Sequence, residues 1–351
     1  MSLLDDLKLL HQRDRQDAFG QAAKQHVQLK HDYKSVDLSS IDRSKIQHVV
    51  IAGMGGSALS ALVLQQYPGL RVPLEIWRNY GAPDYIGEQT LFIASSYSGN
   101  TEETLDALTQ AQAHGCQIAV VAAGGALAEQ AQQQRYPLFE LPPGHQPRME
   151  SLYSYNALVH IVSTLELCTQ ANDYVQELQQ VADWLGEQAE AYKVDVPTSK
   201  NPAKQMALDL VGSSMVVYSG PRLFPAAYKW KISFNENAKN VAWCNQYPEF
   251  NHNEFLGWSS HPVEKPYKVI QLIGSVEHER VQKRFTISER LLSGKKPAAI
   301  TIEAQGETHL QQLLWLIQYG DFVSLYVAIL NGLDPSPVEL IEKLKQSLSN
   351  Q

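Results

Sequence analysis

The stretch IAGMGGSALSAL, residues 51–62, decides the fold that we expect for the chain. An apolar, strand-like run over residues 48–52 ends in a glycine-rich turn, and a helix-like run follows. Such a strand, turn and helix start favour an anion, because free amides and the helix dipole both attract phosphate. The spacing G-x-G-x-x-A also approaches the dinucleotide fingerprint, with Glu75 as a candidate ribose-binding acid. NAD, another phosphate and a purely structural turn therefore remain as alternatives.

Outward from this stretch, short apolar runs alternate with amphipathic ones. We expect strands over residues 49–52, 73–77, 91–95, 118–122, 138–141, 214–218, 268–273 and 298–302. We expect helices within residues 152–190, at about 310–330 and at 338–348. The pattern predicts an α/β fold with mainly parallel sheets flanked by helices. The second half restarts like the first, so we expect a helical extension over 1–40 and two similar domains, 41–192 and 193–351.

Composition narrows the class of protein. The chain has 351 residues and a net charge of −8, which argues against a nucleic-acid partner. Three scattered cysteines and the lack of a secretory signal indicate the cytoplasm. The longest apolar stretch, residues 313–330, is interrupted by Gln318, Asp321 and Ser324, which favours a buried helix over a membrane span.

The stretch SSYSGNTEETL, residues 95–105, favours a phosphate monoester over NAD. Ser96, Ser98 and Thr101 place three hydroxyls beside the free amides of a helix start, and Gly99 permits a tight turn. A single hydroxyl there would usually be only a helix cap. Three within six residues suit a terminal phosphate, which hydroxyls can surround from several sides.

The second half carries candidates for acid–base chemistry in KWKISFNENAKN, residues 229–240, and YPEFNHNEFLGW, residues 247–258. A carboxylate is a good base for moving a proton between two carbons if it is partly buried, and Glu236 is the candidate, although a solvated helix acid is the plain alternative. Histidine is the natural residue type for proton transfer near neutral pH, so His252 could open a sugar ring, although a loop histidine is usually solvated. The spacing of His252, Glu254 and His261 fits no standard metal site, so we expect no metal.

These motifs resemble a known superfamily. The loops GMGGS and SYSGNT together resemble a sugar isomerase (SIS) domain, and the added N-E-N-x-K and P-E-x-x-H-N-E segments resemble the bifunctional phosphoglucose/phosphomannose isomerases. The similarity runs from about residue 45 to the end. It implies two doubly wound SIS domains and isomerisation of glucose 6-phosphate or mannose 6-phosphate to fructose 6-phosphate through a cis-enediol, without cofactor, metal or membrane.

The resemblance also implies residue roles. The sugar phosphate would be bound by Gly55, Gly56, Ser57, Ser96, Ser98 and Thr101. Glu236 would be the base, and Arg148 would stabilise the enediolate. His252 would open the ring from the neighbouring subunit, which implies a homodimer. Lys345, with Lys343 as the second choice, would assist ring opening.

One departure and several rivals remain. Met149, Glu150 and Ser151 follow Arg148, where the family usually has small, apolar residues. Glu150 either faces the site, where it could weaken anion binding, or caps the next helix. A non-catalytic sugar-phosphate sensor would need the serine loop but neither Glu236 nor His252. A NAD-dependent oxidoreductase rests on the first glycine loop alone, and an isomerase of another sugar phosphate is a further alternative.

Overall fold

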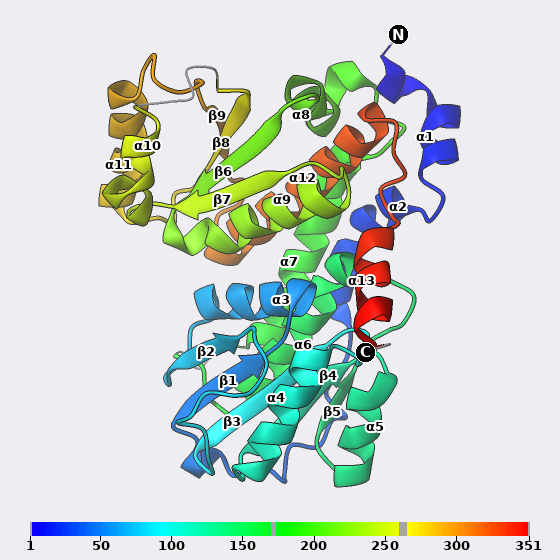
Figure 1. The fold of residues 1–351 in the computed structure, drawn as a ribbon, viewed down its shortest axis with the longest axis vertical. Coiled ribbons are helices and arrows are strands. Elements are labelled where there is room, and N and C mark those ends of the chain that lie inside the picture. The colour runs from blue at the N-terminus through cyan, green and yellow to red at the C-terminus, as the bar shows by residue number, and fades with distance from the viewer. Residues whose placement is uncertain (1, 170–172, 260–264, 350–351) are drawn as a thin grey trace. The chain divides into compact units, whose positions relative to one another are not determined.

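Each half of the chain forms one parallel β-sheet, as the alternation of strand-like and helical runs predicts (Figure 1). The computed structural model describes residues 2–169, 173–259 and 265–349, and these fall into two units. The first unit comprises residues 24–186, and the second unit comprises residues 1–23 and 187–351. The expected extension over residues 1–40 is therefore divided between the two units.

The sheet of the first unit has the strand order β2-β1-β3-β4-β5. Its strands are β1 (His48–Ala52), β2 (Leu74–Trp77), β3 (Thr90–Ser96), β4 (Gln117–Ala122) and β5 (Leu138–Glu140). Its helices are η2 (Gln25–Lys30), η3 (Arg43–Lys45), α3 (Gly55–Gln66), α4 (Glu102–Ala113), α5 (Gly125–Gln134), η4 (Pro147–Met149), α6 (Ser151–Thr164) and most of α7 (Tyr174–Ala189). The chain winds outward in both directions from β1 and β3, so a topological switch point lies between these strands, where α/β proteins usually bind ligands.

The sheet of the second unit has the matching order β7-β6-β8-β9. Its strands are β6 (Ser214–Ser219), β7 (Ala242–Gln246), β8 (Tyr267–Ile273) and β9 (Ile300–Glu303). Its helices are η1 (Leu3–Asp5), α1 (Leu7–Arg13), α2 (Ala18–Ala23), η5 (Glu190–Tyr192), η6 (Thr198–Lys200), α8 (Pro202–Leu210), η7 (Pro221–Leu223), α9 (Phe224–Glu236), η8 (Glu249–His252), α10 (Glu254–Gly257), α11 (Glu279–Leu291), α12 (His309–Leu330) and α13 (Glu339–Ser349). In both sheets all strand pairs are parallel, and the first strand of each unit, β1 or β6, lies second from the edge.

Both units bury their sheets between two helical layers. In the first unit α4 and α5 close one face over Val50, Phe92 and Val120, while α3 and α6 pack together on the other face. Every residue of β3 is buried, as expected for a central strand covered on both faces. In the second unit α11 and the segment around η8 close one face, and α9 packs between the sheet and α12 on the other.

The long helix α12 is the core helix of the second unit. It is long and apolar enough to cross a membrane, but 94% of its most apolar window is buried inside the structure, as predicted for residues 313–330. Gly320 allows close packing with α9, because a side chain there would begin 2.2 Å from the indole nitrogen of Trp230. Beside it, Lys229 and Asp321 form a fully buried ion pair at 2.6 Å, and Ser233 donates to Asp321 at 2.6 Å.

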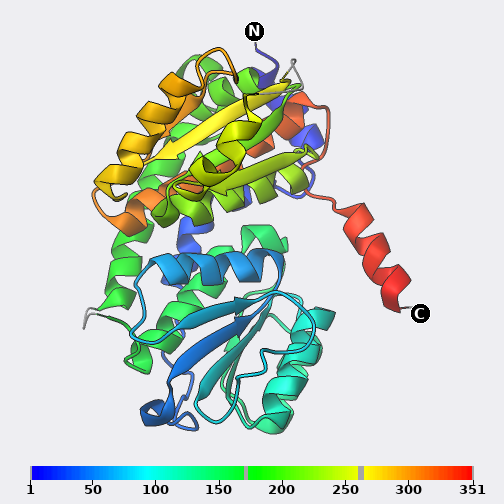
Figure 2. The same ribbon diagram turned by 60° about the vertical axis from the view of Figure 1, so that its left-hand side comes forward.

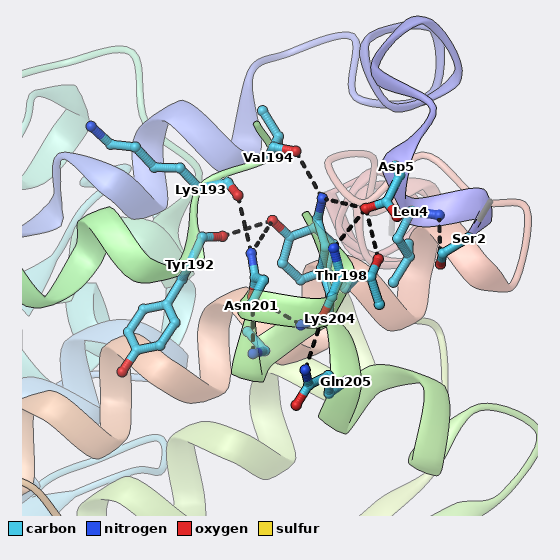
Figure 3. Close-up of polar contacts among 12 residues, drawn as sticks. Ser2, Leu4, Asp5, Tyr192, Lys193, Val194, Thr198, Asn201, Lys204 and Gln205 are labelled. Atoms are coloured by element: carbon cyan, nitrogen blue, oxygen red, sulfur yellow. Dashed lines mark hydrogen bonds and ion pairs between the residues drawn. The ribbon is translucent and has the colours of Figure 1, made fainter. Parts of the chain in front are cut away.

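The first residues of the chain complete this same unit (Figure 3). The carboxylate of Asp5 accepts hydrogen bonds from the amide and the hydroxyl of Thr198, both at 2.8 Å, and lies 3.4 Å from the ammonium of Lys204. Lys204 is buried and also donates to the carbonyl of Val194 at 2.8 Å. Asn201 caps α8 by accepting from the amides of residues 203 and 204. The N-terminal segment is therefore fixed to α8.

Candidate active site

The glycine turn after β1 is shaped by close contacts with neighbouring backbone. Gly55 begins α3 with a positive φ of 50°, and Gly56 lies so close to η4 that an added Cβ would be 2.4 Å from the carbonyl oxygen of Pro147. Gly53 likewise lies against the carbonyl of Ser95, which precedes the serine loop. Since β1 and β3 pair through Ala52 and Ala94, both loops leave the same edge of the sheet side by side.

The serine loop is held in one conformation by its neighbours. Gly99 has a φ of 67°, and a Cβ there would lie 1.7 Å from the carbonyl oxygen of Gly124, so only glycine fits. The Asn100 side chain accepts from the amide of Ala126 at 3.0 Å, which ties the loop to the start of α5. The hydroxyls of Ser96 and Thr101 lie 2.8 Å apart.

These hydroxyls are not used as helix caps. Thr101 occupies the N-cap position of α4, yet its side chain makes no capping hydrogen bond, and Met54 leaves the start of α3 similarly uncapped by a side chain. Two helix starts and a pair of adjoining hydroxyls therefore meet at the switch point. Ser57 and Ser96 are buried, whereas Ser98 is exposed. This arrangement can surround a phosphate with amides and hydroxyls.

Arg148 is fixed beside this place. It lies in η4, which packs on α3, and its Cα is 3.6 Å from the position of a Cβ on Gly56. Only 2% of Arg148 is exposed, and one guanidinium nitrogen lies 3.5 Å from the side-chain oxygen of Gln146. A cation held this deeply next to the start of α3 adds to the attraction for an anion.

The carboxylate of Glu150 is fully buried. Glu150 stands at the N-cap position of α6, but its side chain makes no capping bond and instead accepts from the hydroxyl of Ser154 at 2.9 Å. The simple capping role, one of the two alternatives for this residue, is therefore wrong. Its buried negative charge contributes to raising the pKa of Tyr97, after the larger effect of burial.

Tyr97 and His145 are site residues that the sequence analysis missed. The Tyr97 hydroxyl donates to the carbonyl of Pro142 at 2.9 Å and accepts from the amide of His145 at 2.8 Å. This pair ties the serine loop to the segment that leads into Arg148. Burial lowers the pKa of His145. Tyr97 could have been identified from the sequence, because it lies between the two loop serines Ser96 and Ser98.

In the second unit Glu236 is the last residue of α9 and is half-buried. The flanking asparagines are structural: Asn235 donates to the carbonyl of Asn240 at 2.8 Å, and Asn237 donates to the hydroxyl of Ser324 at 2.9 Å. Glu236 lines a cavity of about 510 Å³, together with Asn235, Lys239, Asp334 and residues 337–341 at the start of α13. The polar cluster predicted around this glutamate is thus a helix end that opens into a cavity.

His252 ends η8 and is exposed. Its neighbour Glu254 is occupied elsewhere, since it accepts from the hydroxyl of Tyr218 and, at 2.7 Å, from the amide of Asn245. Over residues 2–169, 173–259 and 265–349 no group of three or more His, Cys, Asp or Glu side chains could hold a metal ion. His261, the third residue of the rejected metal pattern, lies outside the described residues.

Lys343 and Lys345 are both exposed on α13, which stands clear of the sheet of its own unit in Figure 2. They are two positions apart and so face different directions on the helix. The structure thus gives no preference between them.

The chain is similar to known proteins over most of its length. Residues 199–348 match the bacterial phospho-glucose isomerase C-terminal SIS domain. The chain is 35% identical to a bifunctional phosphoglucose/phosphomannose isomerase from Caldicellulosiruptor bescii, over 88% of this chain and 92% of the relative. It is 30% identical to one from Aquifex aeolicus over the same shares. The fold is similar to the C-terminal domain of glucosamine-fructose-6-phosphate aminotransferase from Francisella tularensis, with a TM-score of 0.65, 14% identity and coverage of 94% and 97%.

Proposed function

The chain belongs to the bifunctional phosphoglucose/phosphomannose isomerases, and we propose that it interconverts glucose 6-phosphate or mannose 6-phosphate with fructose 6-phosphate. The observation that carries this proposal is the anion site at the switch point of the first unit. There Ser96 and Thr101 present adjoining hydroxyls between the starts of α3 and α4. We assign the phosphate to Gly55, Gly56, Ser57, Ser96, Ser98 and Thr101.

The proton transfer is assigned to Glu236. Its carboxylate would take the proton from C2 of the open-chain aldose, which gives a cis-enediol, and would return it to C1 to form the ketose. The hydroxyl proton moves in the same sense, from O2 to O1, so C2 is oxidised as C1 is reduced and no external electron acceptor is required. Accessibility from a cavity and partial burial both support a base at this position.

Arg148 is assigned to the negative charge that develops on the enediolate oxygens. Its deep burial means that its charge is little screened by water, which favours such a role. His252, which is exposed, is assigned to ring opening at a site shared with a partner subunit, and a homodimer follows from this assignment. Lys345, or Lys343, would assist that step.

We place the enzyme in the cytoplasm. The three cysteines, Cys116, Cys168 and Cys244, form no disulfide, which supports a reducing compartment.

The test is direct. Purified protein is mixed with fructose 6-phosphate in the presence of EDTA, and the products are separated by chromatography, with Glu236→Gln and the exposed control Glu303→Gln alongside. We expect glucose 6-phosphate and mannose 6-phosphate from the wild type and the control. We expect Glu236→Gln to lose about 10²–10⁴-fold in turnover while still binding the sugar phosphate. Binding without turnover in the wild type would contradict the isomerase and favour a sugar-phosphate sensor or another substrate.

A further inference from the structure

The second unit has its own counterpart of the phosphate site. In each unit the first strand is followed by a glycine and then a helix start: Gly53 follows β1, and Gly220 follows β6. In each unit the next strand inward is β3 or β8, and a loop follows it; Gly53 lies against Ser95 near the end of β3, and Gly220 lies against Glu277 in the loop after β8. In the first unit that loop is the serine loop, and in the second it comprises residues 274–278.

In the second unit this place is filled by the carboxyl group of Glu277. The carboxyl packs directly on Gly220, so that a Cβ on the glycine would lie 2.2 Å from the Glu277 Cδ. One carboxyl oxygen accepts from the amide of Leu223, at the start of α9, at 3.0 Å. Only 5% of Glu277 is exposed. A buried acid therefore sits where the equivalent helix start of the first unit is left uncapped.

Further polar atoms surround the same helix start. The hydroxyl of Ser219, directly before Gly220, and the side-chain oxygen of Gln312 are buried and, among the described residues, lack hydrogen-bond partners. That oxygen of Gln312 and the side chain of Leu223 both lie against Gly274, at the beginning of the Glu277 loop. The Ser219 hydroxyl can donate to an anion, whereas the Gln312 oxygen can only accept, so this hydroxyl is the donor that Glu277 leaves unsatisfied beside the helix start.

We propose that the junction of β6 and α9 is a second anion site, that the chain's own Glu277 carboxyl occupies it, and that phosphate binds there once this side chain is removed. The proposal needs no substrate turnover and is independent of the assigned isomerase activity. It explains why two equivalent sheets need not bind two sugar phosphates.

The test compares Glu277→Ala with Glu277→Gln and the wild type. Binding of inorganic phosphate is measured by calorimetry at pH 8. Alanine empties the place, whereas glutamine keeps both its volume and its acceptor oxygen. We expect Glu277→Ala to bind one phosphate more per chain than the wild type, and Glu277→Gln to bind the same number as the wild type. The extra phosphate should persist when Ser98→Ala and Thr101→Val are added to disable the first site.

The test compares the number of phosphates bound by each variant. It therefore remains decisive even if the wild type binds no phosphate and the proposed function is wrong. A folded Glu277→Ala chain with no additional phosphate would overturn the proposal. If this variant does not fold in dilute buffer, the measurement is instead whether phosphate restores its native fold. Native circular dichroism regained in phosphate, but not in chloride of equal ionic strength, would support the second site, and failure to recover in phosphate would overturn it.

Discussion

The loop after β3 and the loop after β8 occupy equivalent places in two similar units, yet they have opposite properties. The first presents the hydroxyls of Ser96 and Thr101 to two uncapped helix starts. The second turns the acid Glu277 inward and closes its helix start from within. A shared fold therefore need not distribute function evenly, because a few loop residues decide whether a helix start is open to an anion or already occupied by a side chain. In the proposed mechanism the second unit supplies Glu236 and His252 instead.

The largest effect that we predict concerns the buried ion pair of Lys229 and Asp321 in the second unit. It measures how strongly each charge depends on the other for its stability in the interior. Lys229→Met leaves Asp321 buried without its partner ammonium, and we expect a loss of about 3–5 kcal/mol in unfolding free energy. The double variant Lys229→Met, Asp321→Met removes both charges, so its unfolding free energy should fall by less than that of the single variant. Chemical denaturation measures both, and additive losses would contradict the coupling.

Two glycines sharpen the comparison between the loops. Gly99→Ala must place a Cβ against the carbonyl of Gly124 at a positive φ, so we expect a cost of about 3 kcal/mol and loss of phosphate binding. Gly220→Ala has an ordinary φ of −79° and displaces only the flexible end of Glu277, so it should cost clearly less. Thermal unfolding and calorimetry decide the order, and equal costs would show that the two turns are equally rigid.

The hydroxyls of the serine loop should govern substrate affinity. Each of Ser98→Ala and Thr101→Val should raise KM for fructose 6-phosphate by about tenfold, because a hydrogen bond to a charged group contributes about 1.5–3 kcal/mol. The matched control is Ser275→Ala in the equivalent loop of the second unit, which should leave KM unchanged. Steady-state kinetics test this, and an equal rise in the control would remove the distinction between the loops.

The smallest predicted effect concerns pH. Burial raises the pKa of Glu277 to about 7, although the backbone amides of Leu223 and Arg222 and the charge of Arg222 oppose the shift. A carboxyl whose pKa is higher in the folded than in the unfolded state contributes stability below its unfolded pKa, and this is lost as pH rises through about 7. Between pH 5 and 8 the Tm of the wild type should therefore fall by a few degrees more than the Tm of Glu277→Gln. Parallel pH profiles of the two proteins would contradict this.

Sequence reasoning predicted most of the fold, because the buried parallel strands are continuous apolar runs. The exception is β7, whose residues 242–246 end in Cys244, Asn245 and Gln246. An edge strand pairs on one side only and needs no such apolar run, so its pattern is weak. The candidate phosphate residues were identifiable because glycines and clustered hydroxyls have few other reasons to occur together.

Other features depend on contacts that sequence order does not reveal. Asn235 and Asn237 look like site residues in the sequence, but their amides bond to Asn240 and Ser324. Glu277 resembles any loop acid until the register of β6 and β8 brings it against Gly220. Glu150 similarly showed its buried state only when η4 and α6 were in place.

The hydrogen bonds of Asp5 have a consequence for how the protein is made. A ribosome delivers residues 24–186 as one continuous segment, so the first unit can fold as soon as that segment has emerged. The second unit joins residues 1–23 to residues 187–351, and Asp5 meets Thr198 across 193 positions of the chain. Residues 1–23 are synthesised before both of these segments and must therefore wait, without their final partners, until the residues from 187 onward have been translated.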